Sequence, residues 1–198
     1  MTGYRRSVWQ VIAIAAFAAT AALAVTLTRP QPIVSVAAAS ACRATGMYAW
    51  LGAAAASGTV RQVAAATEKA SADAVYALEF TNISGRACSL DGYPGVWAYT
   101  GGRQIGSPAS LDPSVRPSTV TLAPHATAHA VLRYTLTASF SASACAQVTV
   151  RELRVYLPHA GGTLLVPLTI PACSRKGPDF LSVQAVQPRA GIPGFPHY

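Results

Sequence analysis

Two histidines, His125 and His129, have the His-x-x-x-His spacing that places two metal ligands on one face of a helix. Pro124 and the alternating pattern around them argue against a helix. On a strand, residues four apart are separated by about 13 Å, too far to share an ion. We interpret both as surface histidines. His159 falls in a turn and His197 in the tail, so the sequence predicts no metal ligand.

The acidic residues do not suggest a general acid and base. Asp91 precedes a glycine and Asp112 a proline, which is typical of turns, and Glu79 alternates outward on its strand. The others are too scattered to pair: Glu68, Asp73, Glu152 and Asp179. No Gly-x-Ser-x-Gly motif occurs. We predict no catalytic residue and no cofactor, and interpret the chain as a protein that is not an enzyme.

The cysteines predict a structural role. There are four of them, an even number, and all lie beyond an N-terminal apolar segment: Cys42, Cys88, Cys145 and Cys173. No Cys-x-x-Cys occurs, which disfavours zinc or thiol redox chemistry. In an oxidising compartment they predict two disulfides, and the sequence permits three pairings. We favour Cys42–Cys88 and Cys145–Cys173.

Residues 1–32 are typical of an export segment. Arg5 and Arg6 precede an apolar stretch over 8–27, and two prolines then end any helix. The segment is interpreted either as an uncleaved single-pass anchor or as a cleaved signal peptide, and the length of the apolar stretch favours the anchor. The positive-inside rule places the rest of the chain outside in both cases. Lipidation of Cys42 is disfavoured because it leaves an odd number of cysteines.

Composition narrows the function classes. The 198 residues are 52% hydrophobic and only 11% charged, so the chain can bury a core. The formal net charge is +8, but the arginines are scattered and no basic run tracks phosphates. We therefore predict no nucleic-acid binding, and only a weak preference for anionic surfaces such as lipid headgroups or acidic wall polymers.

Short alternating segments dominate the exported part. They are expected as strands at 46–51, 75–81, 96–99, 118–122, 128–136, 153–157, 163–169 and 180–186, with turn signals between them and a hairpin at 100–103. The sequence predicts an all-β fold, an immunoglobulin-like antiparallel β-sandwich of about seven to nine strands preceded by the export or transmembrane helix. An up-and-down barrel is the alternative.

The predicted organisation has five parts. The export segment (1–32) leads through a linker (33–41) to the sandwich domain (42–188). Within the domain, 53–74 is rich in alanine, serine and threonine, and we interpret it as a flexible insertion with a short helix. A Pro/Gly-rich tail (189–198) follows, and the stretch from 187 onward is expected to fray.

One phrase carries a resemblance. Leu78-x-Phe80-Thr81-Asn82, followed by Cys88-Ser89-Leu90-x-Gly92-Tyr93-Pro94-Gly95-Val96, resembles the signature of an actinobacterial extracytoplasmic domain family of unknown function. The resemblance covers roughly 42–188. It implies the immunoglobulin-like sandwich and the two disulfides favoured above. It carries no established catalytic residue that could be transferred to this chain.

We expect an exported cell-envelope protein, a monomer that acts as a non-catalytic binding or structural module. Its expected partners are the membrane, through the N-terminal segment, and an envelope protein or wall polymer. The alternatives are an envelope hydrolase or transferase with an unrecognised site, and a periplasmic-type metal-binding protein. Trp50, Trp97 and Tyr99 could form an aromatic patch, although a tryptophan on a sandwich strand is more often part of the core.

Overall fold

The structure is a computed structural model that describes residues 39–56, 59–60, 74–159 and 161–193. The chain divides into residues 1–36, which lie outside this part, and residues 37–198. The described residues are mostly strand, which confirms the all-β prediction. In chain order the strands are β1 Met47–Ala56, β2 Thr59–Val60, β3 Ala74–Asn82, β4 Cys88–Asp91, β5 Gly95–Thr100, β6 Arg103–Ile105, β7 Ser110–Asp112, β8 Thr119–Leu122, β9 Thr127–Tyr134, β10 Gln147–Tyr156, β11 Thr163–Cys173, β12 Leu181–Gln184 and β13 Gln187–Pro188.

Helix is scarce in the part of the chain that the structure describes. It comprises α1, Ala142–Cys145, and two 3₁₀ turns, Ala44–Gly46 and Thr137–Ser139. Ser141 caps α1 by accepting a hydrogen bond from the Ala144 amide at 3.2 Å. Among the described residues, no helix has the length and apolar character needed to cross a bilayer.

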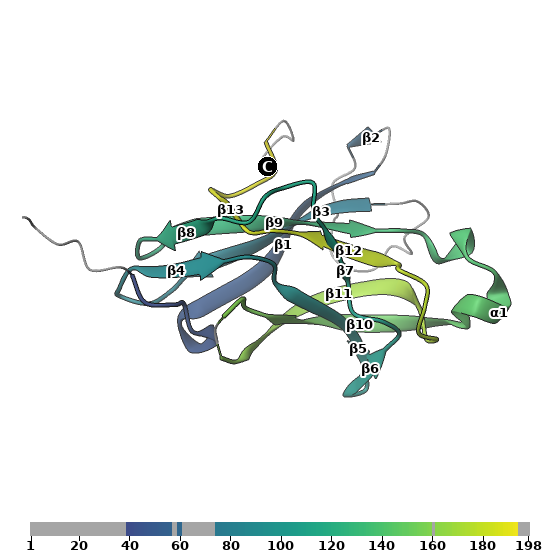
Figure 1. The fold of residues 1–198 in the computed structure, drawn as a ribbon. Coiled ribbons are helices and arrows are strands. Elements are labelled where there is room, and N and C mark those ends of the chain that lie inside the picture. The colour runs from purple at the N-terminus through teal and green to yellow at the C-terminus, as the bar shows by residue number, and fades with distance from the viewer. Residues whose placement is uncertain (1–38, 57–58, 61–73, 160, 194–198) are drawn as a thin grey trace, which may run out of the picture. The chain divides into compact units, whose positions relative to one another are not determined.

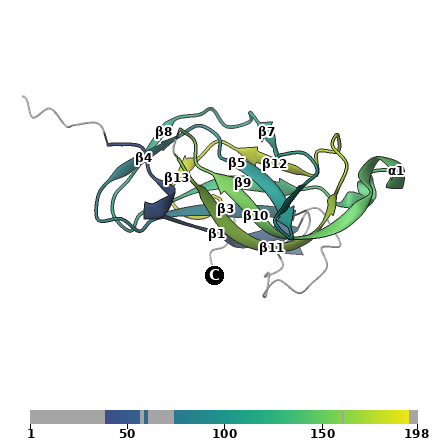
Figure 2. The same cartoon turned by 90° about the horizontal axis from the view of Figure 1, so that it is seen from below.

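The strands form three sheets. The largest has the order β2-β1-β3-β9-β12-β7, with β13 also paired to β9, the second has the order β11-β10-β5-β6, and β4 pairs with β8. Figure 1 shows the two larger sheets as stacked layers, and Figure 2 shows their strands overlapping when the same view is turned. The described part has thirteen strands, more than the predicted seven to nine, because several of them are only two to four residues long.

The core lies between the two larger sheets. Leu78 and Phe80 of β3 are fully buried, as the alternation of that strand predicts. Across the interface, Leu153 and Val155 of β10 are also fully buried, and all four belong to one apolar cluster. Burial of this apolar surface is the main force that holds the sheets together.

Strand β1 is longer than predicted. It pairs antiparallel with β3 from Met47 through Ala56, with a register shift between Leu51 and Ala54. The segment predicted as a flexible insertion therefore begins as part of the sheet, and β2 extends it as a hairpin. Residues 57–58 and 61–73, where the spacing predicts a short helix, lie outside the described residues.

The C-terminal stretch also differs from the prediction. Gln187 and Pro188 form β13 and pair with β9. The chain continues over the outer face of the large sheet, where the Gly191 amide donates to Oε1 of Glu79 at 2.7 Å. Residues 187–191 are therefore held against the sheet and not frayed. Residues 194–198 lie outside the described part.

Asp112 fastens the edge strand β7, which pairs parallel with β12. Nε2 of Gln184 donates to its Oδ2 at 2.9 Å, and the Ser114 amide donates to Oδ1 at 3.0 Å. The side-chain hydrogen bond from Gln184, followed by those from Ser114, holds the pKa of Asp112 at about 2, below its ordinary value of 3.8.

This carboxylate predicts a pH dependence. Because its pKa is lower in the folded state, the ionised group stabilises the fold above about pH 4, and that contribution is lost as the pH falls towards about 2. We expect Asp112→Asn to be less stable than the wild type near neutral pH, and the difference to shrink in acid. Urea unfolding of both proteins at about pH 6, 4 and 2 measures it. A difference that stays constant would contradict the assignment.

Candidate functional site

The four predicted cysteines form two disulfides. Cys42 is bonded to Cys88 with a Cα–Cα distance of 4.8 Å, and Cys145 is bonded to Cys173 with a distance of 4.3 Å. These are the two favoured pairings. All four residues are buried in the apolar cluster. Their role is structural, and two disulfides indicate an oxidising environment outside the cytoplasm.

The two histidines of the His-x-x-x-His motif are separated by their surroundings. His125 is exposed in a turn, with φ of 65°. His129 is only 1% exposed, and its Nδ1 lies 2.8 Å from the carbonyl oxygen of Arg189. The surface interpretation is therefore wrong for His129. Among the described residues, no group of three or more His, Cys, Asp or Glu side chains could hold a metal ion.

Glu79 is buried on the outer face of the large sheet, although the alternation of β3 predicts it to face outward into solvent. It is 2% exposed and lies opposite His129 on β9. The C-terminal stretch covers it through the Gly191 hydrogen bond. Gly52 makes room for the carboxylate, because a Cβ there would lie 3.2 Å from Oε1. Strand alternation correctly places Glu79 on the outer face of the sheet, but it does not indicate that the C-terminal stretch covers that side chain.

Aromatic side chains gather on the outer face of the four-stranded sheet. Val96 and Ala98 of β5 point into the core, so Trp97 and Tyr99 point the other way and are partly exposed. The Trp97 ring meets the Tyr156 ring edge to face, with centroids 4.6 Å apart. Trp97 is therefore an outer-face residue, which corrects the core interpretation of this tryptophan.

An arginine completes this cluster. The guanidinium of Arg154 lies 4.0 Å from the centroid of the Tyr99 ring, a cation–π arrangement, and its Nη2 is 3.4 Å from Oε1 of Glu152. Leu165 on the neighbouring strand lies opposite Arg154 and is 60% exposed. We call this surface the aromatic face and define it by six residues: Trp97, Tyr99, Glu152, Arg154, Tyr156 and Leu165.

Trp50 does not belong to the aromatic face. It lies on β1 of the large sheet, is 37% exposed, and donates from Nε1 to Oγ1 of Thr81 at 3.4 Å. Tyr48, two residues earlier, is 58% exposed. The three aromatic residues singled out in the sequence are thus divided between two sheets and do not form a single patch.

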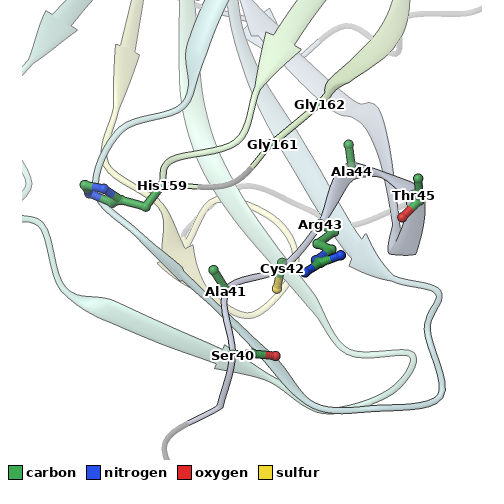
Figure 3. Close-up of a pocket in the computed structure, with 9 residues that line it drawn as sticks. All are labelled: Ser40, Ala41, Cys42, Arg43, Ala44, Thr45, His159, Gly161 and Gly162. Atoms are coloured by element: carbon green, nitrogen blue, oxygen red, sulfur yellow. The ribbon is translucent and has the colours of Figure 1, made fainter.

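A second region of interest is the end of the domain where the described chain begins. We call it the N-terminal pole and define it by the described residues of four loops: 39–46, 82–87, 123–126, and 157–159 with 161–162. Two open hollows of about 660 and 580 Å³ flank the segment 40–45. Arg43 lines both of them, and Arg86 lines the second. Figure 3 shows the first hollow, where the His159 ring points away from Arg43.

Residues 52–187 match a family described as a domain of unknown function, DUF4232. No curated protein and no solved structure matches the chain. The matched residues include the aromatic face and three of the four cysteines, and they make up well over half of the chain. The protein therefore belongs to the DUF4232 family.

Proposed function

We propose that this chain is an exported cell-envelope protein of an actinobacterial, extracytoplasmic kind, whose immunoglobulin-like sandwich is a non-catalytic binding module. The aromatic face is its binding surface, and a protein of the envelope is its partner. Residues 1–32 direct export, as anchor or signal peptide. The observation that carries the proposal is the cluster of Trp97, Tyr99, Arg154 and Tyr156 on the outer face of a sheet, where all four side chains are at least partly exposed.

The composition of the aromatic face supports a binding role. Tryptophan, tyrosine and arginine are the residue types that dominate the energetics of protein interfaces. Here cross-strand contacts already hold their side chains in place, so less conformational entropy is lost on binding. Leu165 adds an aliphatic side chain that is 60% exposed, which is costly to leave in water unless something covers it.

The charge of the aromatic face favours a protein over an acidic wall polymer. Its one arginine is engaged by Glu152 and by the Tyr99 ring, so the surface has no net positive charge to attract phosphates. An exposed leucine beside aromatic rings suits the apolar centre of a protein interface. Among the six residues that define the aromatic face, an acidic polymer would find no unpaired cation.

Leu165→Ser tests the proposal. In cross-linking on cells followed by mass spectrometry, we expect the wild type to yield a specific envelope protein, and Leu165→Ser to weaken the measured affinity for that purified partner at least about tenfold. Gly95→Ala should also weaken it, because a Cβ there would lie 2.8 Å from Cη2 of Trp97 and push the indole aside.

Leu111→Ser is the matched control. Leu111 is 59% exposed on β7, almost the same exposure as Leu165, but belongs to the large sheet. It should bind the partner like the wild type. Equal losses in Leu111→Ser and Leu165→Ser would overturn the proposal, as would binding of the wild type to purified wall polymer with no protein partner.

A further inference from the structure

We propose that the N-terminal pole is a docking surface for a bilayer that contains anionic phospholipids, with arginine side chains on the lipid phosphates and an exposed aliphatic side chain at the interface. The aromatic face then points sideways, free for a partner. This inference rests on the proposed function only in that the protein is exported with residues 8–27 retained as its anchor. The residues that carry it are different from those of the aromatic face.

The four loops of the N-terminal pole share a distinctive composition. None of 39–46, 82–87, 123–126 and 157–162 contains an aspartate or glutamate. Together they carry four residues with basic side chains, all exposed: Arg43, Arg86, His125 and His159. A patch of basic residues attracts a negatively charged membrane surface, and each arginine near that surface adds to the attraction.

The arginines are accompanied by apolar and aromatic groups that suit a membrane interface. Ile83, in the same loop as Arg86, is 54% exposed, and Tyr48, near the start of β1, is 58% exposed. An exposed isoleucine in the same loop as an arginine can enter the headgroup layer while the charge stays at the phosphates. Tyrosine is enriched at the same depth of a bilayer.

The loops are held in place by one another. The Ile83 amide donates to the Gly46 carbonyl at 2.9 Å, and the Ala44 amide donates to the Gly161 carbonyl at 3.4 Å. The Cys42–Cys88 disulfide joins the first of these loops to the start of β4, directly after the 82–87 loop. The N-terminal pole therefore presents Arg43 and Arg86 on a fixed scaffold, and docking costs little ordering of the backbone.

One hollow has the chemistry for a phosphodiester. Arg43 and Arg86 both line it, together with Ser40 and Thr45, which carry hydroxyl groups. Guanidinium and hydroxyl groups are the usual donors to phosphate oxygens. Its volume of about 580 Å³ is open to the outside, as a site for a headgroup at a membrane surface must be.

The short connection between the predicted apolar stretch and the domain favours a membrane as the partner of the N-terminal pole. The predicted apolar stretch ends at Leu27, and the described domain begins twelve residues later at Ala39, within the N-terminal pole. A fully extended chain of that length spans about 40 Å. If residues 8–27 lie in the bilayer, this end of the domain cannot be further than that from its surface.

Hydrogen exchange tests the inference on the full chain with its N-terminal segment retained, placed in nanodiscs of phosphatidylcholine alone or with a third of phosphatidylglycerol. We expect slower exchange in 40–46 and 83–87 when phosphatidylglycerol is present. Arg43→Gln/Arg86→Gln should abolish that difference, because losing two surface arginines lowers the ratio of docked to undocked protein about 30-fold. Ile83→Asp, which replaces the exposed aliphatic side chain by a carboxylate in the loop that carries Arg86, should abolish it as well.

Arg103→Gln/Arg175→Gln is the matched control. Both arginines are exposed and lie at the opposite end of the strands, so this variant should keep the difference. Equal exchange of the wild type in both nanodiscs would overturn the inference. The inference would also be overturned if adding the soluble headgroup glycerophosphoglycerol to the protein in pure phosphatidylcholine nanodiscs slowed exchange as much as phosphatidylglycerol does. That result would indicate a site for a free phosphodiester. The Leu165→Ser result does not bear on these outcomes.

Discussion

Replacing Cys42 and Cys88 together by alanine is expected to lower the free energy of unfolding by about 4 kcal/mol. The disulfide joins residues 46 positions apart, and cross-linking a loop of that length removes much entropy from the unfolded chain. It also fastens the start of the domain, where the Cys42 amide donates to the Ser89 carbonyl and the Ser89 amide to the Ser40 carbonyl, both at 2.9 Å. Equilibrium unfolding in denaturant measures the loss.

The second disulfide supplies the control. Cys145→Ala/Cys173→Ala opens a loop of 28 positions, and the loss should be slightly smaller, about 3.5 kcal/mol. The two variants should differ in where they loosen the fold. Only the first should speed hydrogen exchange in 40–46, because only Cys42–Cys88 reaches the N-terminal pole. A loss below about 1 kcal/mol in the first variant would show that this cross-link is not a main source of stability.

Local patterns predicted much of the fold because they report backbone geometry directly. Tyr76, Leu78 and Phe80 alternate with polar or small residues, and the structure buries all three on one face of β3. Gly101 and Gly102 predicted a hairpin, and both have positive φ, at 55° and 75°. Such features depend only on neighbours in the chain, so a single sequence contains them.

Features that depend on distant segments were missed for the same reason. Strand alternation places Glu79 and His129 on the outer face of the sheet, as it does for surface residues. The C-terminal stretch, more than fifty residues away in the sequence, covers them. That stretch is rich in proline and glycine, which is equally typical of a frayed tail. No local pattern distinguishes a covered sheet face from an open one.

At the aromatic face, strand alternation and residue type predict opposite positions for the same side chain. The preference of tryptophan for buried positions favoured a core role for Trp97. Its neighbours Val96 and Ala98 are fully buried, so the pleat sends Trp97 to the other side. A strict use of alternation on β5 would have placed it correctly. The cross-strand contact with Tyr156 still required the register of β5 and β10, which the sequence does not contain.

Asn82 ends β3 and holds three segments together. It is fully buried, and its Nδ2 donates to the carbonyl oxygens of Arg86 at 2.9 Å, Leu122 at 3.1 Å and Ala123 at 3.2 Å. Its Oδ1 accepts from the amide of Ser84 at 3.0 Å and from Oγ of the same residue at 2.7 Å. One side chain thus fixes the 82–86 turn and ties it to the end of β8.

Asn82→Ala should therefore destabilise the domain by about 3 kcal/mol, because buried carbonyl groups lose their donor and the turn loses its acceptor. Asn82→Asp should be at least as harmful: it keeps the acceptor for Ser84 but turns a carboxylate oxygen towards three carbonyl groups. Ser84→Ala removes a single hydroxyl and should cost only about 1 kcal/mol. Denaturant unfolding of the three variants measures this order. If Asn82→Asp matched the wild type, the turn would be held by the Ser84 contacts, and the bonds from Nδ2 would contribute little.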